Sequence, residues 1–182
     1  MPNLAILFAD GCEEIEGLTV VDICRRAGFH IDMISINPDN IDILGAHNIP
    51  FECDEMFEDV NITNYDAIIL PGGGKGTENL KAFAPLPDVL KNFIASGKLV
   101  AAICAAPSVL GVLGLLKERK ATCYPGFEEQ LEGAIITPVH AITDGNIITG
   151  QGMGAALDFS LEIVRYFTDT ETVEQMKKTV IY

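Results

Sequence analysis

Cys104 is the residue of this sequence best placed to act as a nucleophile. It lies between the apolar run Leu99–Ile103 and a segment beginning at Pro107, so we expect it on a sharp turn from a buried strand into a helix. The small residues Ala105 and Ala106 leave room for such a turn. The first N–H groups of the helix would stabilise a thiolate and lower its pKa. The alternative is an inert cysteine packed as a small hydrophobe, as most cysteines are.

Two further segments carry groups that could assist a thiolate. The run Gly72-Gly73-Gly74 follows a predicted strand, and its backbone N–H groups could bind an oxyanion, although a plain tight turn is the alternative. Glu16 lies where it can point across the rim of a sheet toward Cys104. Repulsion from a thiolate would favour its protonated form, which could donate a hydrogen bond or transfer a proton.

The remaining titratable residues are interpreted as structural. Glu13 and Glu14 complement the dipole of the first helix, and the three histidines have no local relation to Cys104. The five cysteines are odd in number and contain no Cys-x-x-Cys pair, which is typical of a reducing compartment. We therefore expect neither a metal nor a cofactor.

Short apolar runs alternate with helical patterns along the chain. This alternation predicts an α/β fold in which a mostly parallel sheet carries helices on both faces. In such sheets ligands bind beyond the carboxyl ends of the strands, where Glu16, Gly72 and Cys104 would converge. The predicted strands are 4–9, 31–36, 65–70, 99–103, 122–124, 139–143 and 146–149, with a hairpin in 41–53. The predicted helices are 14–27, 89–96, 107–116, 127–131 and 155–167, followed by a polar helix.

Length and charge restrict the classes of function. The 182 residues fit a single domain, residues 1–182, and a net charge of −14 does not favour nucleic acid as a direct partner. The N-terminus lacks the basic region of a signal peptide, and no apolar stretch is long enough to span a membrane. We expect a cytoplasmic protein without membrane association.

The sequence resembles the ThiJ/PfpI superfamily, also called the DJ-one family, and is most similar to its parkinsonism-associated deglycase/ThiJ branch. The resemblance covers essentially the whole chain. It is carried by the segments 10–16 (DGCEEIE), 21–28 (VDICRRAG), 70–73 (LPGG), 101–107 (AAICAAP) and 150–154 (GQGMG).

The resemblance implies a flavodoxin-like three-layer sandwich that usually forms a homodimer. It also implies an easily oxidised nucleophile at Cys104, a protonated Glu16 hydrogen-bonded to it, and oxyanion-type donors near Gly72, Gly73 and Ala105. The family's activities are a cofactor-independent glyoxalase reaction and deglycation of early adducts, together with oxidative-stress sensing and chaperone-like holding.

The sequence departs from the family pattern in three respects, at four positions. Tyr124 stands where the branch has a histidine implicated in proton transfer, with Asp22 as its companion across the dimer; tyrosine titrates far from neutral pH. His47 and Gln151 replace two arginines and so remove fixed positive charge. Ala105 replaces the histidine that follows the cysteine in the peptidase branch.

This resemblance, together with the residues around Cys104, implies a cysteine-dependent, cofactor-independent glyoxalase- or deglycase-type enzyme that acts on small α-oxoaldehydes or their adducts. In it Cys104 and Glu16 are catalytic, and Gly72, Gly73, Ala105 and Tyr124 bind the oxyanion or substrate. A non-enzymatic oxidative-stress sensor or a redox-regulated chaperone is the alternative. A cysteine peptidase is favoured least.

Overall fold

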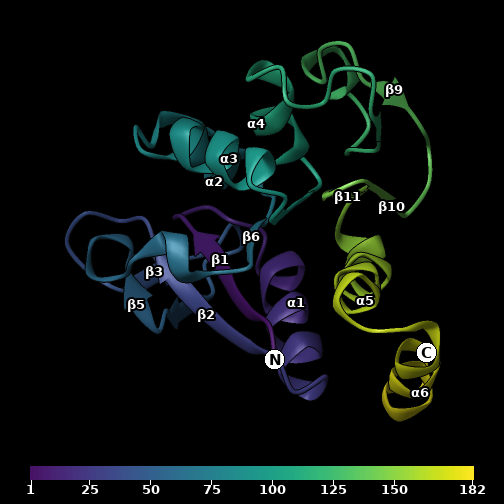
Figure 1. Cartoon of the computed structure of the whole chain (residues 1–182). Coiled ribbons are helices and arrows are strands. Elements are labelled where there is room, and N and C mark those ends of the chain that lie inside the picture. The colour runs from purple at the N-terminus through teal and green to yellow at the C-terminus, as the bar shows by residue number, and fades with distance from the viewer.

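A seven-stranded sheet forms the centre of the computed structural model, which describes residues 1–182 (Figure 1). Its strand order is β10-β11-β7-β6-β1-β2-β5, and every neighbouring pair is parallel except β10 and β11. The strands are β1 (Asn3–Phe8), β2 (His30–Ser35), β5 (Glu55–Met56), β6 (Ala67–Leu70), β7 (Leu99–Ile103), β10 (Ala141–Asp144) and β11 (Ile147–Gly150). The mostly parallel α/β sheet predicted from the sequence is confirmed.

Helices cover both faces of this sheet and make it the middle of three layers (Figure 1). One layer holds α1 (Glu14–Arg26) and α5 (Ala156–Phe167), with α6 (Thr170–Val180) packed against α5. The other layer holds α2 (Gly74–Ala82), α3 (Leu86–Ala95) and α4 (Pro107–Val112). No helix is both long and apolar enough to cross a membrane.

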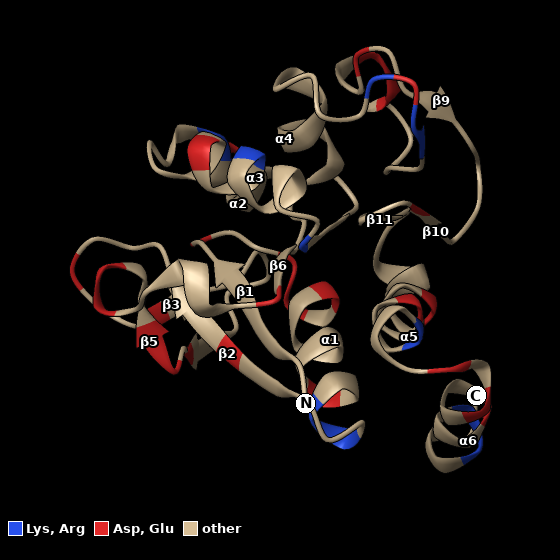
Figure 2. Ribbon diagram, in the orientation of Figure 1, with Lys and Arg blue, Asp and Glu red and all other residues tan.

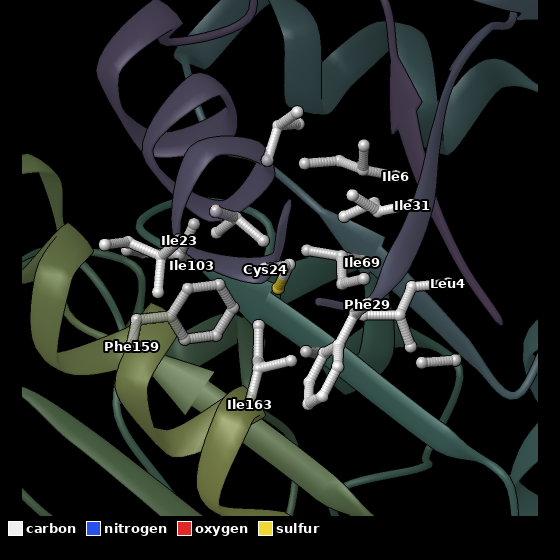
Figure 3. Packing of buried hydrophobic residues seen from close by; sticks show 14 of the residues in the cluster. Leu4, Ile6, Ile23, Cys24, Phe29, Ile31, Ile69, Ile103, Phe159 and Ile163 are labelled. Carbon is white, nitrogen blue, oxygen red and sulfur yellow. The ribbon is translucent and has the colours of Figure 1, made fainter. Parts of the chain in front are cut away.

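The core follows from the alternation of side chains along each strand. On β1, Ile6 faces the α1 and α5 layer, whereas Leu7 faces α3 and α4, and both are fully buried. Figure 3 shows the first of these layers, where Ile23 of α1 and Phe159 of α5 lie close to Ile103 of β7. Burial on both faces explains why these strands are continuous apolar runs.

Two small sheets lie outside the central one. The hairpin predicted in 41–53 is present as β3 (Asp42–Leu44) paired with β4 (Pro50–Glu52). The strand predicted at 122–124 is wrong, because the short strand β8 is Lys120–Ala121, paired with β9 (Ile135–Ile136). Beyond β8 the backbone N–H groups leave the ladder: that of Thr122 donates to Thr149 Oγ1 at 2.9 Å.

Three helical segments differ from the sequence prediction. The helix expected over 127–131 is only a single 3-10 turn, Glu128–Gln130. The helix expected over 107–116 ends at Val112, and Gly114 follows with a φ of +71°, a left-handed conformation that ends helices. Helix α2 was not predicted, because the glycines at 72–74 and 76 indicate a turn more than a helix. It starts at Gly74, the last residue of the glycine run, and carries Gly76 against the backbone of Cys12, where a Cβ would lie 2.7 Å from Cys12 N.

Candidate functional site

Cys104 follows β7 and turns the chain toward α4. Its φ is +66°, a left-handed conformation that non-glycine residues rarely adopt, so the backbone is strained here. Its N–H donates to Gly150 O at 3.0 Å, and its carbonyl accepts from Tyr124 N at 2.8 Å. These two bonds hold the strained turn from both sides. Cys104 is partly exposed, whereas the other four cysteines are buried.

Glu16 reaches Cys104 from α1, although only 1% of the residue is exposed. Its Oε2 accepts a hydrogen bond from Gly72 N at 3.0 Å, and its carboxyl group and the Cys104 side chain both lie against Gly72, close enough for each to shift the pKa of the other. Gly17 lets α1 lie this close to the sheet, since a Cβ there would be 2.2 Å from the Phe8 ring. Sequence reasoning missed Gly17; the signal was a glycine inside an otherwise regular helix pattern.

The second oxygen of Glu16 indicates where the shared proton lies. Oε1 is buried and has no ordinary donor as a partner, which is costly for a charged oxygen. A proton on Oε1 turns it into a donor, and the Cys104 side chain, which lies with Glu16 against Gly72, is the nearby group that it could serve. Consistent with this, burial raises the pKa of Glu16 from 4.5 to about 7. Glu16 is thus suited to be a neutral acid near neutral pH.

The Cys104 thiol does not have the lowered pKa that its position before a helix predicts. Burial, followed by the charge and hydrogen bond of an ionised Glu16, raises its pKa to about 12. The N–H groups of Gly73 and Ala105 act in the opposite direction. Helix α4 begins with Pro107, which has no N–H group to offer. Once Glu16 is protonated, its charge no longer opposes the thiolate and its O–H can donate to the sulfur.

The glycine run has two separate parts in the structure. Gly72 lies between the two reactive side chains, since a Cβ there would be 2.4 Å from Glu16 Oε2 and 2.5 Å from Cys104 Cβ. Its N–H is donated to Glu16, which differs from the expected role as an oxyanion donor. The N–H groups of Gly73, which has a φ of +90°, and of Ala105 instead act on Cys104, whose pKa they lower.

Tyr124 lies beside the elbow, with its side chain half exposed, whereas the neighbouring Cys123 is buried. It lines a hollow together with residues that follow β11. Asp22 lines a different hollow, between α1 and the end of α6, and is paired with Arg26 at 2.6 Å. Within one chain, therefore, Asp22 and Tyr124 do not share a hollow. The lining of the Tyr124 hollow is Tyr124, Pro125, His140, Gln151, Gly152, Met153, Gly154 and Ala155.

None of the three histidines is hydrogen-bonded to Cys104; their side chains pair with acidic residues elsewhere. The His47 ring lies next to the carboxylates of Glu13 and Glu14. Each of the three groups offers one atom that could bind a metal ion, and these atoms lie within 4.8 Å of one another. His47 Nδ1 lies 3.0 Å from Glu14 Oε2, and His47 N donates to Glu14 Oε1 at 2.8 Å. We interpret the group as an ion pair that fastens the 45–48 loop to α1.

The fold and the elbow together define a flavodoxin-like α/β protein with a cysteine at the carboxyl end of a central strand. The profile of the DJ-1/PfpI family matches residues 3–166, and the chain belongs to this family. It superimposes on oxidised DJ-1 of Toxoplasma gondii with a TM-score of 0.95 at 30% identity, covering 100% of this chain and 99% of that one.

Curated relatives give the family its named activities. The chain is 30% identical to a deglycase of Pyrococcus abyssi, over 90% of this chain and 98% of the relative. It is 31% identical to the glutathione-independent glyoxalase DJR-1.2 of Caenorhabditis elegans, over 97% of this chain and 90% of the relative. Protein DJ-1 homolog B of Arabidopsis thaliana is 34% identical over 98% of this chain, which spans only 41% of that longer protein.

Proposed function

We propose that this protein is a cysteine-dependent, cofactor-independent enzyme of the glyoxalase or deglycase type, acting on small α-oxoaldehydes or their adducts. The observation that carries the proposal is the pairing of Cys104 with a buried Glu16 that is poised to hold a proton. Relatives named deglycase and glyoxalase support it.

The proposed reaction needs no external oxidant. The Cys104 thiolate adds to the aldehyde carbon of methylglyoxal, and the N–H groups of Gly73 and Ala105, which lie at the sulfur, stabilise the resulting oxyanion. Neutral Glu16 gives its proton to that oxyanion, and the carboxylate so formed takes the hydrogen of the same carbon as a proton and returns it to the neighbouring carbonyl carbon. The hydroxyl proton passes to the neighbouring oxygen, so the first carbon is oxidised to a thioester and the second is reduced to an alcohol. Water hydrolyses the thioester to lactate and frees the thiol.

Lactate formation from methylglyoxal tests this proposal. Cys104→Ser should lower kcat/KM by at least about a hundredfold, because a serine hydroxyl is a far weaker nucleophile than a thiolate. Cys24→Ala is the matched control, since it removes another thiol that is fully buried in α1. Unchanged turnover in Cys104→Ser, or equal losses in both variants, would remove the assignment.

A redox response of Cys104 is the second candidate, favoured by its exposure relative to the four buried cysteines. One peroxide would convert the thiolate to a sulfenate and water, and a second would give a sulfinate. The N–H groups of Gly73 and Ala105 could hold the added oxygens. In peptide mass spectrometry after mild peroxide, Cys104 should be oxidised before Cys24. Equal rates would exclude a sensor.

We also propose a homodimer in a reducing, cytoplasmic setting. Ile15 of α1 and Ile49 of the 45–49 loop are 50% and 51% exposed, and both line the apolar hollow beside α1. Burying such side chains against a second copy would stabilise a dimer. Sedimentation should give twice the 19.6 kDa chain mass, and Ile15→Glu should shift it to one chain. A wild-type protein that stays monomeric at high concentration would contradict this.

A further inference from the structure

The Tyr124 hollow adjoins the reactive elbow. Its wall formed by 151–155 follows directly after Gly150, whose carbonyl accepts the Cys104 N–H at 3.0 Å. Its lining also contains Tyr124, whose N–H donates to Cys104 O at 2.8 Å. The volume of the hollow is about 460 Å³, within the range of small-molecule sites. A substrate carbon bound to Cys104 would therefore have this space beside it.

The lining contains no lysine or arginine. Strand β11 itself and the turn that leads from it into α5 carry no basic residue (Figure 2). The single ionisable imidazole, His140, has its Nδ1 2.6 Å from Asp158 Oδ2, so a proton there is already matched by a carboxylate. The whole chain carries a net charge of −14. An anionic substituent in the hollow would lose water without gaining a cation as a partner.

Two side chains offer apolar contact instead. Tyr124 and Met153 are each 51% exposed on the rim of the hollow. The Tyr124 ring is positioned before any ligand arrives, because Gly152 packs against it: a Cβ at Gly152 would lie 3.2 Å from Tyr124 Cδ2. Aromatic and thioether groups form favourable contacts with flat apolar groups.

We propose that this hollow is a substrate subsite that receives the uncharged, apolar substituent of an aldehyde bound to Cys104. Tyr124 and Met153 contact that substituent, and the absence of a cation discriminates against carboxylate or phosphate groups. Tyr124, in the place of the expected histidine, is thus a specificity-determining residue. The inference rests on the proposed function, whose substrate class it narrows to alkyl and aryl oxoaldehydes.

Matched substrates test the subsite. The wild-type kcat/KM should be at least about tenfold higher for phenylglyoxal than for para-carboxyphenylglyoxal, which differs by one carboxylate. Tyr124→Ala should lower the ratio of phenylglyoxal to methylglyoxal turnover about three- to tenfold, and Tyr124→Phe should retain the ratio. Gln151→Arg should selectively improve the carboxylated substrate. Ile135→Ala is the control, since Ile135 is 53% exposed on β9 and does not line the hollow.

A measurement without turnover separates the two proposals. The measured quantity is the rate of Cys104 alkylation by N-benzyliodoacetamide divided by its rate of alkylation by iodoacetamide. This ratio should fall about three- to tenfold in Tyr124→Ala and stay at the wild-type value in Ile135→Ala. If methylglyoxal is not turned over and this effect is present, the proposed function fails while the subsite stands. If neither the turnover ratio nor the alkylation ratio responds to Tyr124→Ala, the subsite is overturned, whatever the enzyme does with methylglyoxal.

Discussion

Replacing Glu16 with glutamine should make the protein more stable at alkaline pH. The buried carboxyl has a folded-state pKa of about 7 against 4.5 when solvated, so folding favours its neutral form. The stability it contributes is fully present below pH 4.5 and is lost as the pH rises through about 7. One pH unit corresponds to about 1.4 kcal/mol, so the interval amounts to about 3 kcal/mol. Glutamine stays neutral and escapes this loss.

Urea unfolding under reducing conditions, at pH 5 and pH 8.5, measures the effect. The unfolding free energy of Glu16→Gln minus that of the wild type should rise by about 2.5 kcal/mol between the two pH values, because part of the loss has already occurred at pH 5. The rise should persist on a Cys104→Ala background, because burial is the largest cause of the raised pKa.

Glu14→Gln is the matched control and should behave in the opposite sense. Burial tends to raise the pKa of Glu14, but hydrogen bonds from His47 outweigh it and lower the pKa. Glu14 therefore contributes stability above its solvated pKa, and its loss should cost more at alkaline than at acid pH. If the unfolding free energies of Glu16→Gln and the wild type differed by the same amount at both pH values, the conclusion that Glu16 is a buried carboxyl with a raised pKa would be refuted.

Three further predictions concern the same region. Gly72→Ala should destabilise the protein by about 1–3 kcal/mol in urea unfolding and disturb Cys104 alkylation, because the new Cβ meets Glu16 and Cys104. Gly74→Ala, where a Cβ meets nothing within 4 Å, should have little effect, and equal losses would contradict the close packing. The free energy of unfolding of Cys104→Gly should exceed that of Cys104→Ala by about 1 kcal/mol, because glycine adopts a φ of +66° without the strain that alanine has there. A more stable Cys104→Ala would exclude backbone strain at the elbow. The Glu14 hydrogen bond raises the pKa of His47, so NMR titration should place it above that of a free imidazole, and Glu14→Gln should return it; an unaltered titration would argue against the pair.

The central strands and the turn at Cys104 could be predicted from the sequence. Buried parallel strands appear as continuous apolar runs, and the turn is marked by residues next to Cys104 in the chain. It did not predict α2, since the glycines that allow close approach to Cys12 have low helix propensity. Nor did it predict that Gly72 N–H is used by Glu16, a contact across 56 residues. Local patterns contain no information on such a partner.

The desolvation of Cys104 was missed for a similar reason. A residue before a predicted helix suggests a stabilised thiolate, but Pro107 withholds an N–H group and Glu16 brings negative charge next to the sulfur. Only the packing of α1 against β1, allowed by Gly17, places that carboxyl there. The family resemblance implied the Glu16–Cys104 pair, whereas spacing along the chain only allowed it.

The division of labour between Cys104 and Glu16 is tested most directly in the Glu16→Gln variant. With carbon-13-labelled methylglyoxal, NMR should show the hemithioacetal carbon in this variant and its absence in Cys104→Ala. Lactate formation in Glu16→Gln should fall by about a hundredfold or more, the usual contribution of a general acid–base group. Lactate formed at the wild-type rate by Glu16→Gln, or a hemithioacetal that survives loss of the Cys104 thiol, would contradict the account.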